Sequence, residues 1–176
     1  MELNNTKLPI YIFCLILFVL LSSCGEKKQD LKRNYLSAQT DEEVRHLASD
    51  IRSLGVDGVP IFVEAMTSSL EKQDTLIGYS KLIVSLKGLN ELAKNGIFTE
   101  DEVFALLLVL KKQRSIQDSL LTADTIYKIT NVNVGYNLDF VKNYTVDDEN
   151  ARQKLISEWE GLIMKSLHAK SVGSVQ

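Results

Sequence analysis

An unbroken apolar run lies close to the beginning of the chain. Residues 10–21 read IYIFCLILFVLL and follow the polar stretch MELNNTK, which carries Lys7. A helix of this length spans about 18 Å, whereas the hydrocarbon core of a bilayer is about 30 Å thick. The run is therefore too short for a comfortable transmembrane helix and has the length of the apolar region of a secretory signal peptide.

From residue 40 onward, apolar positions recur three and four residues apart, which is the spacing of one face of a helix. Val44, Leu47, Ala48, Ile51 and Leu54 form the first such stripe. The run VFALLLVL at 103–110 is apolar on all sides, and we expect its helix to be central. The pattern predicts helices over about 40–54, 61–70, 76–94, 99–110, 119–130 and 155–167, with a short helical turn at 138–144.

Capping and stop residues stand at the boundaries of these stripes. Thr40 is followed three residues later by Glu43, and Thr99 by Glu102, as in a capping box. Gly55 follows the first stripe, where a left-handed residue commonly ends a helix. Short links between helices favour antiparallel neighbours. We therefore predict an all-α fold of stacked antiparallel helical hairpins, like a fragment of a HEAT/ARM α-solenoid.

The residues after the apolar run form a recognisable motif. Leu21-Ser22-Ser23-Cys24 precedes Gly25 and resembles the lipobox of bacterial lipoproteins. That resemblance implies that the Cys24 thiol receives a diacyl lipid, that the leader is cut just before Cys24, and that the new amino terminus is acylated. Two or three acyl chains make membrane attachment effectively permanent. A plain signal anchor with a cysteine at this position is the alternative.

These patterns divide the chain into four parts. Residues 1–23 are predicted to be the signal peptide, and 24–39 the lipidated cysteine followed by a polar tether. The tether is inferred because GEKKQDLKRNYLSAQ lacks apolar periodicity until Tyr35 and Leu36. Residues 40–168 are predicted to form the helical domain, and 169–176 a frayed tail. Gly25 is not the Asp of the enterobacterial inner-membrane retention signal, so a cell with two membranes would place the protein at its outer membrane, facing the periplasm or the cell surface.

Two segments of the body resemble HEAT-repeat proteins. GVPIFVEAM at 58–66 is similar to the second helix of a HEAT repeat. The stretch from Ile126 to Asn137, with the later Trp159, resembles the closing segment of exported bacterial HEAT-repeat proteins. Asn131 stands where that segment usually has Gly, and Leu162 where it has a second Trp. The resemblance implies a fold and not an activity.

Composition narrows the classes of function. The chain is 45% apolar and 24% charged, with a net charge of −3 and a pI near 5.5. These values are typical of a globular protein and argue against a nucleic-acid-binding surface, which would be basic. The two cysteines are Cys14, inside the leader, and Cys24. The exported body therefore has neither a disulfide nor a thiolate nucleophile.

Few residues of the body suggest chemistry. His46 and Asp50 are one helical turn apart, with Glu43 on the same side, which could orient an imidazole for acid–base catalysis. A solvated pair on a polar helix face is the commoner meaning of this spacing. His168 suits the last turn of a helix, and Asp147-Asp148-Glu149 suits a helix start. We find no phosphate loop, nucleophile elbow or metal-ligand spacing, and expect no enzyme activity, no metal and no cofactor other than the lipid on Cys24.

Two further features of the sequence each have two interpretations. Tyr136 and Tyr144 flank an irregular stretch and could present aromatic anchors to a partner, although packing onto the last helix is the commoner role. Asp74-Thr75-Leu76, Asp118-Ser119-Leu120 and Asp124-Thr125-Ile126 resemble the O-glycosylation sequon of exported Bacteroidetes proteins, but these residues also serve as ordinary caps.

The function expected from the sequence is a membrane-tethered, non-catalytic interaction module of the bacterial cell envelope, with a protein partner of unknown identity. The alternative is a lipoprotein inhibitor or immunity protein that blocks a toxin or a hydrolase.

Overall fold

The computed structural model describes residues 25–94, 98–113, 116–132 and 156–166. Within these ranges every regular element is a helix, which confirms the predicted all-α fold. The elements are a first helix over 25–37, α2 (Asp41–Arg52), the 3-10 helix η1 (Gly55–Gly58), α3 (Val59–Ser69), the 3-10 helix η2 (Leu70–Lys72), α4 (Leu76–Leu92), α5 (Glu100–Lys112), α6 (Ile116–Thr130) and a last helix over 156–166. None of these described helices is long and apolar enough to cross a membrane.

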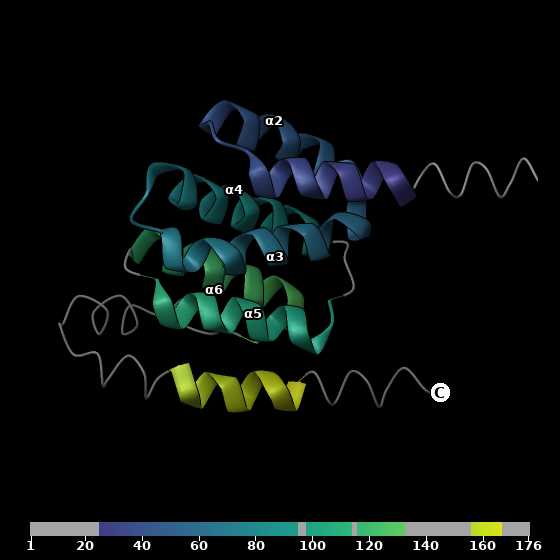
Figure 1. Ribbon diagram of the computed structural model, residues 1–176. Coiled ribbons are helices and arrows are strands. Elements are labelled where there is room, and N and C mark those ends of the chain that lie inside the picture. The colour runs from purple at the N-terminus through teal and green to yellow at the C-terminus, as the bar shows by residue number, and fades with distance from the viewer. Residues whose placement is uncertain (1–24, 95–97, 114–115, 133–155, 167–176) are drawn as a thin grey trace, which may run out of the picture.

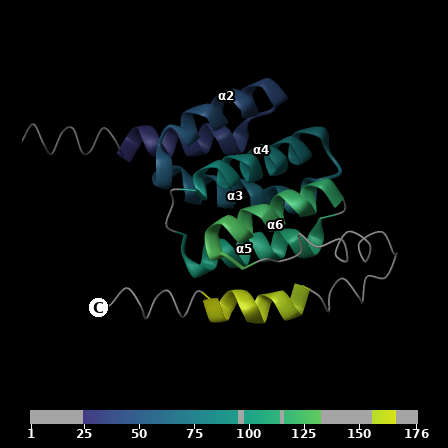
Figure 2. The ribbon, with the colours of Figure 1, turned by 180° about the vertical axis from the view of Figure 1, so that it is seen from behind.

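The helices alternate between two layers. The first helix, α3 and α5 lie in the layer nearer the viewer in Figure 1, whereas α2, α4 and α6 lie in front in Figure 2. Helix α4 contacts α2 and α6 within its own layer and packs most extensively on α3 in the other. Consecutive helices thus form three stacked hairpins, and the last helix runs beside α5 at one end of the stack (Figure 1).

Both predicted capping boxes are confirmed. The Thr40 hydroxyl accepts the Glu43 N–H at 3.2 Å, and the Glu43 carboxylate accepts the Thr40 N–H at 3.1 Å. The Thr99 hydroxyl accepts the Glu102 N–H at 3.3 Å, with the return bond at 2.8 Å. Each box satisfies two backbone donors that a helix start would otherwise leave without a partner.

Two residues with left-handed backbone end helices. Gly55, three residues after the end of α2 and at the start of η1, has φ of 61°, as its position in the sequence predicts. Asn131 has the same φ after α6, and its N–H donates to the Tyr127 carbonyl at 2.7 Å. Asn is the residue that most readily replaces Gly in this conformation, so α6 ends at Asn131 without a glycine.

Close contact between α3 and α4 forms the centre of the core. Phe62 of α3 and Leu86 and Leu89 of α4 are fully buried. At Gly88 the two helices approach so closely that a Cβ atom would lie 2.4 Å from the Phe62 ring. The Phe62 ring therefore occupies the space that any other residue at position 88 would need.

The structure differs from expectation at residues 25–37, for which the sequence predicts a polar tether. They form a helix, and Tyr35 is completely buried. The Tyr35 ring meets the Phe62 ring edge to face at a centroid distance of 5.9 Å, and its hydroxyl lies 2.9 Å from Ser85 Oγ. Leu31 and Leu36 pack partly buried against the same core. Three large side chains on a charged helix form too narrow a stripe to be recognised as apolar periodicity in the sequence. They are enough to dock the helix because the body offers a matching apolar surface.

Charged side chains of the first helix also hold it to the body. Lys28 pairs with Asp57 of η1 at 2.9 Å, and Lys32 pairs with Glu64 of α3 at 2.5 Å. Because each pair is substantially exposed, its energetic contribution is small, but both fix the direction of the helix along α3.

Two further expectations need correction. Helix α5 is not enclosed on all sides, because Phe104 is 38% exposed and Leu108 is 43% exposed. Its neighbours α3, α6 and the last helix leave one side open. The apolar residues that predict a helix over 155–167 are also only partly enclosed, because Ile156, Trp159 and Ile163 are buried but Leu162 is 55% exposed.

Candidate functional site

Several residues proposed from the sequence lie outside the described part of the chain. They are Leu21, Ser22, Ser23, Cys24, Tyr136, Tyr144, Asp147, Asp148, Glu149 and His168. The candidate catalytic residues that the structure does describe are Glu43, His46 and Asp50, all on α2.

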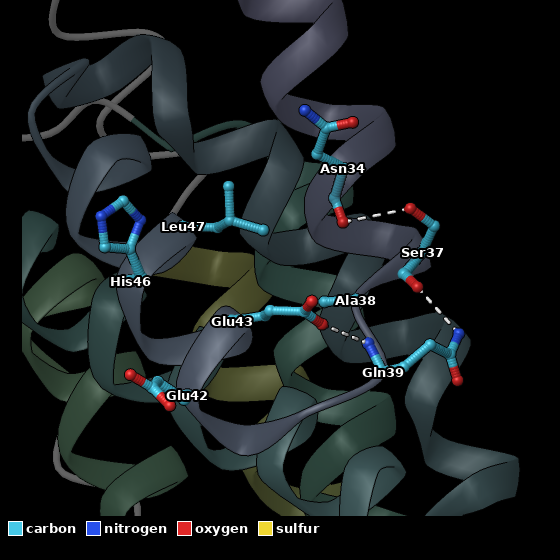
Figure 3. Close-up of a pocket in the computed structure, with 8 residues that line it drawn as sticks. All are labelled: Asn34, Ser37, Ala38, Gln39, Glu42, Glu43, His46 and Leu47. Atoms are coloured by element: carbon cyan, nitrogen blue, oxygen red, sulfur yellow. Dashed lines mark hydrogen bonds between the residues drawn. The ribbon is translucent and has the colours of Figure 1, made fainter.

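Glu43 and His46 border a groove of about 560 Å³. The groove lies where the first helix turns into α2, and Figure 3 shows its lining from both helices and the link between them. The lining residues are Asn34, Ser37, Ala38, Gln39, Glu42, Glu43, His46 and Leu47. The groove therefore brings together residues that a short link already places near one another.

Glu43 takes part in the structure of the link and does not project freely into the groove. Its carboxylate accepts the backbone N–H groups of Gln39 at 2.9 Å and Thr40 at 3.1 Å, and Figure 3 shows it pointing toward Gln39. These hydrogen bonds, the one from Gln39 first, lower the pKa of Glu43 below its ordinary value. A carboxylate stabilised in its charged form is a poor proton acceptor near neutral pH.

His46 and Asp50 form an exposed pair on the helix surface. His46 Nδ1 lies 3.8 Å from Asp50 Oδ2, and the two side chains are 77% and 56% exposed. An imidazole oriented for acid–base catalysis needs a hydrogen bond of about 2.6–3.2 Å to its partner carboxylate. The geometry is that of the solvated i,i+4 pair, and Figure 3 shows the imidazole well apart from the Glu43 carboxylate. Among the described residues, no group of three or more His, Cys, Asp or Glu side chains is placed to hold a metal ion.

A half-buried polar network joins α4 to α6, and the sequence does not predict it. Lys128 Nζ donates to Asp124 at 2.6 Å and to the side-chain oxygen of Asn90 at 2.7 Å. The Asn90 amide in turn donates to Asp124 at 2.7 Å and to Thr125 at 3.0 Å. The i,i+4 spacing of Asp124 and Lys128 is a visible signal, but nothing in the sequence brings Asn90 beside them. The network sets the register between two helices of one layer.

The three Asp-Ser/Thr triplets differ sharply in accessibility. Thr75 is exposed and caps α4, where its hydroxyl accepts the Gly78 N–H at 3.1 Å. Ser119 and Thr125 are completely buried in α6. A hydroxyl without exposed surface cannot meet a transferase in the folded domain, so Thr75 is the one member of the three that the fold leaves accessible.

Exposed apolar side chains occur in pairs on two helices. Leu76 and Tyr79, one turn apart on α4, are 78% and 43% exposed. The Tyr79 hydroxyl donates to Asp118 at 3.1 Å, and burial followed by this bond raises the Tyr79 pKa. Phe104 and Leu108 form a second pair on α5. Aromatic and large aliphatic side chains of this kind contribute much of the binding energy of protein interfaces.

The chain matches no family model, no curated protein and no solved structure at a significant level.

Proposed function

We propose that the protein is a lipid-anchored, non-catalytic interaction module of the bacterial cell envelope. The observation that carries the proposal is the succession of a short apolar run, Leu21-Ser22-Ser23 and Cys24. In this proposal the protein contributes binding, and the chemistry at Cys24 is performed on it by processing enzymes. A HEAT-like relationship of the three stacked hairpins forms part of the proposal.

The fold supports a binding role through its surface. Stacked hairpins present side chains from several helices on one continuous face, and such faces serve binding in helical repeat proteins. Here Phe104 and Leu108 of α5 offer apolar area in one layer, and Tyr79 of α4 and Tyr127 of α6 offer aromatic rings with a polar end in the other. A lipid anchor raises the effective concentration of such a surface near other envelope proteins.

The anchor is tested by labelling cells with a radioactive fatty acid and comparing the native chain with Cys24→Ser. We expect labelled, shortened protein for the native chain and unlabelled, precursor-sized protein for Cys24→Ser. Ser23→Ala is the matched control, because it keeps a small residue before Cys24 and should be labelled normally. Equal labelling of the native chain and Cys24→Ser would overturn the lipoprotein proposal.

The binding role is tested by photo-crosslinking in living cells. A photoreactive phenylalanine analogue at Phe104 or Tyr127 should yield a discrete heavier band, whereas the same analogue at the exposed Lys87 of α4 should not. Identical patterns at all three positions would contradict a specific surface. A crosslinked hydrolase or toxin whose activity falls on addition of the purified domain would favour the inhibitor or immunity alternative.

A further inference from the structure

The first helix leaves no room for a flexible tether. Gly25, the residue after Cys24 in sequence, is already helical, and the helix is docked on the body from Lys28 onward. A helix rises about 1.5 Å per residue, so Lys28 lies about 4.5 Å along the helix axis from Gly25, which directly follows Cys24 in the sequence. The headgroup layer of one leaflet is roughly 5–8 Å thick.

The Lys28–Asp57 pair connects this first helical turn to η1. The 2.9 Å distance between Lys28 Nζ and Asp57 Oδ1 places η1 beside the part of the helix nearest to Cys24. Val56, the neighbour of Asp57 in η1, is 55% exposed although it is apolar. The exposed Lys27 lies on the same turn as Lys28. The edge of the stack where η1 lies thus presents a Val and a Lys side chain where a lipidated Cys24 would meet the membrane.

We infer that the first helix is a rigid anchor that holds the edge of the helical stack where η1 lies, with the exposed side chain of Val56, in the headgroup layer of the membrane. The inference rests on the proposed lipid at Cys24. It deepens the proposed function, because it orients the whole domain. The short chain between Cys24 and the docked turn keeps η1 close to the lipid.

The opposite edge of the stack, where η2 lies and α4 begins, points away from the membrane in this arrangement. Leu76 lies there, at the start of α4, because α3 runs from η1 to η2 and α4 begins just after η2. The 11 residues of α3 run from one of these edges to the other, which is a distance of about 16 Å. Figure 1 shows the start of the first helix on the side where α3 begins, next to η1, and the start of α4 on the other side. Leu76, 78% exposed, would therefore remain available in the aqueous phase.

The test uses the processed, lipidated protein in vesicles of phosphatidylethanolamine and phosphatidylglycerol. The body contains no cysteine beyond Cys24, whose thiol carries the lipid, so V56C and L76C each introduce one free thiol for an environment-sensitive fluorophore. Nitroxide-labelled lipid headgroups should remove at least about half of the fluorescence at position 56 and leave position 76 almost unchanged, because quenching reaches little beyond the headgroup layer. Both substitutions replace exposed apolar residues, so they form a matched pair.

A third variant tests whether the rigid first helix, and not the lipid alone, keeps position 56 at the membrane. Ten Gly and Ser residues inserted between Gly25 and Glu26 add a flexible span of about 17 Å. We expect this insertion to abolish the quenching at position 56 while acylation and vesicle binding persist. Equal quenching at 56 and 76, or unchanged quenching after the insertion, would overturn the rigid anchor and leave the proposed function intact. Absence of an acyl group on Cys24 would overturn both.

Discussion

At the scale of single residues, Tyr35 is the side chain whose role differs most between sequence and structure. It lies at the end of a charged stretch, yet its ring is buried against Phe62 and its hydroxyl lies 2.9 Å from Ser85 Oγ. Burial is the main cause that raises the pKa of Tyr35 to about 12, while the Ser85 hydrogen bond lowers it. A buried tyrosine with a single hydroxyl partner ties the first helix to α4.

This environment predicts how stability depends on pH. Between pH 10 and about 12, Tyr35 ionises in the unfolded chain but remains protonated in the folded one. The contribution of Tyr35 to the free energy of unfolding should therefore be complete below pH 10, and the free energy of unfolding should fall across this interval by roughly 2–3 kcal/mol. Urea denaturation at several pH values measures the fall, and Tyr35→Phe should remove this part of it.

Tyr35→Phe also removes a buried hydrogen bond. We expect the free energy of unfolding at pH 7 to drop by about 1 kcal/mol, because the Ser85 hydroxyl loses its partner. Tyr127→Phe serves as the control, since Tyr127 is 40% exposed and its change should stay within about 0.5 kcal/mol. Equal effects of the two substitutions would contradict the assigned role of the Tyr35 hydroxyl.

Gly88 gives a second prediction at this scale. A methyl group at this position would lie 2.4 Å from the buried Phe62 ring, so Gly88→Ala should destabilise the fold by about 1–3 kcal/mol. A methyl group at Gly161 of the last helix would meet no atom of a neighbouring element within 4 Å. Gly161→Ala should therefore stabilise the chain by about 0.5–1 kcal/mol through helix propensity. Thermal unfolding of the two variants should give melting temperatures that shift in opposite directions.

At the scale of helices, local signals account for where most elements begin and end. Capping residues act on the four backbone N–H groups at a helix start, and these lie within a few positions in sequence. The boxes at Thr40 and Thr99 were therefore predictable, as was the turn at Gly55. The first helix was not, because its stability comes from contacts with α3 and α4 rather than from its own apolar pattern.

The cap of α5 can be tested with a conservative pair of substitutions. Thr99→Ala removes the hydroxyl that accepts the Glu102 N–H and should cost about 1 kcal/mol of unfolding free energy. Thr99→Ser keeps an oxygen at the same place and should be nearly neutral. Chemical denaturation would contradict the assigned cap if the serine variant were as destabilised as the alanine variant.

At the scale of the whole molecule, the last helix belongs to the same core as the stacked hairpins. Trp159 and Ile163 are buried, and Lys111 of α5 pairs with Glu160 at 2.7 Å. Ser166 also donates to the Thr130 carbonyl at 3.0 Å, at the end of α6. These contacts join segments that are far apart along the chain.

This packing predicts cooperative unfolding. The chain contains a single tryptophan, so fluorescence reports on Trp159 alone, whereas far-ultraviolet circular dichroism reports on all helices. If the last helix shares the core, the two signals should give the same urea midpoint. A fluorescence transition at clearly lower urea than the dichroism transition would show that the last helix unfolds as a separate unit.

The sequence by itself determined the features that depend on neighbouring residues: the helical class of the fold, the capping boxes, the left-handed stop at Gly55 and the motif that ends at Cys24. Only the tertiary structure decided which distant residues meet. Tyr35 reaches Ser85 across 50 positions, Asn90 meets Asp124 across 34, and Thr125 is buried while Thr75 is exposed. Helix starts follow from local hydrogen bonds, but burial depends on how complete helices pack, and one apolar stripe fits several arrangements of its neighbours.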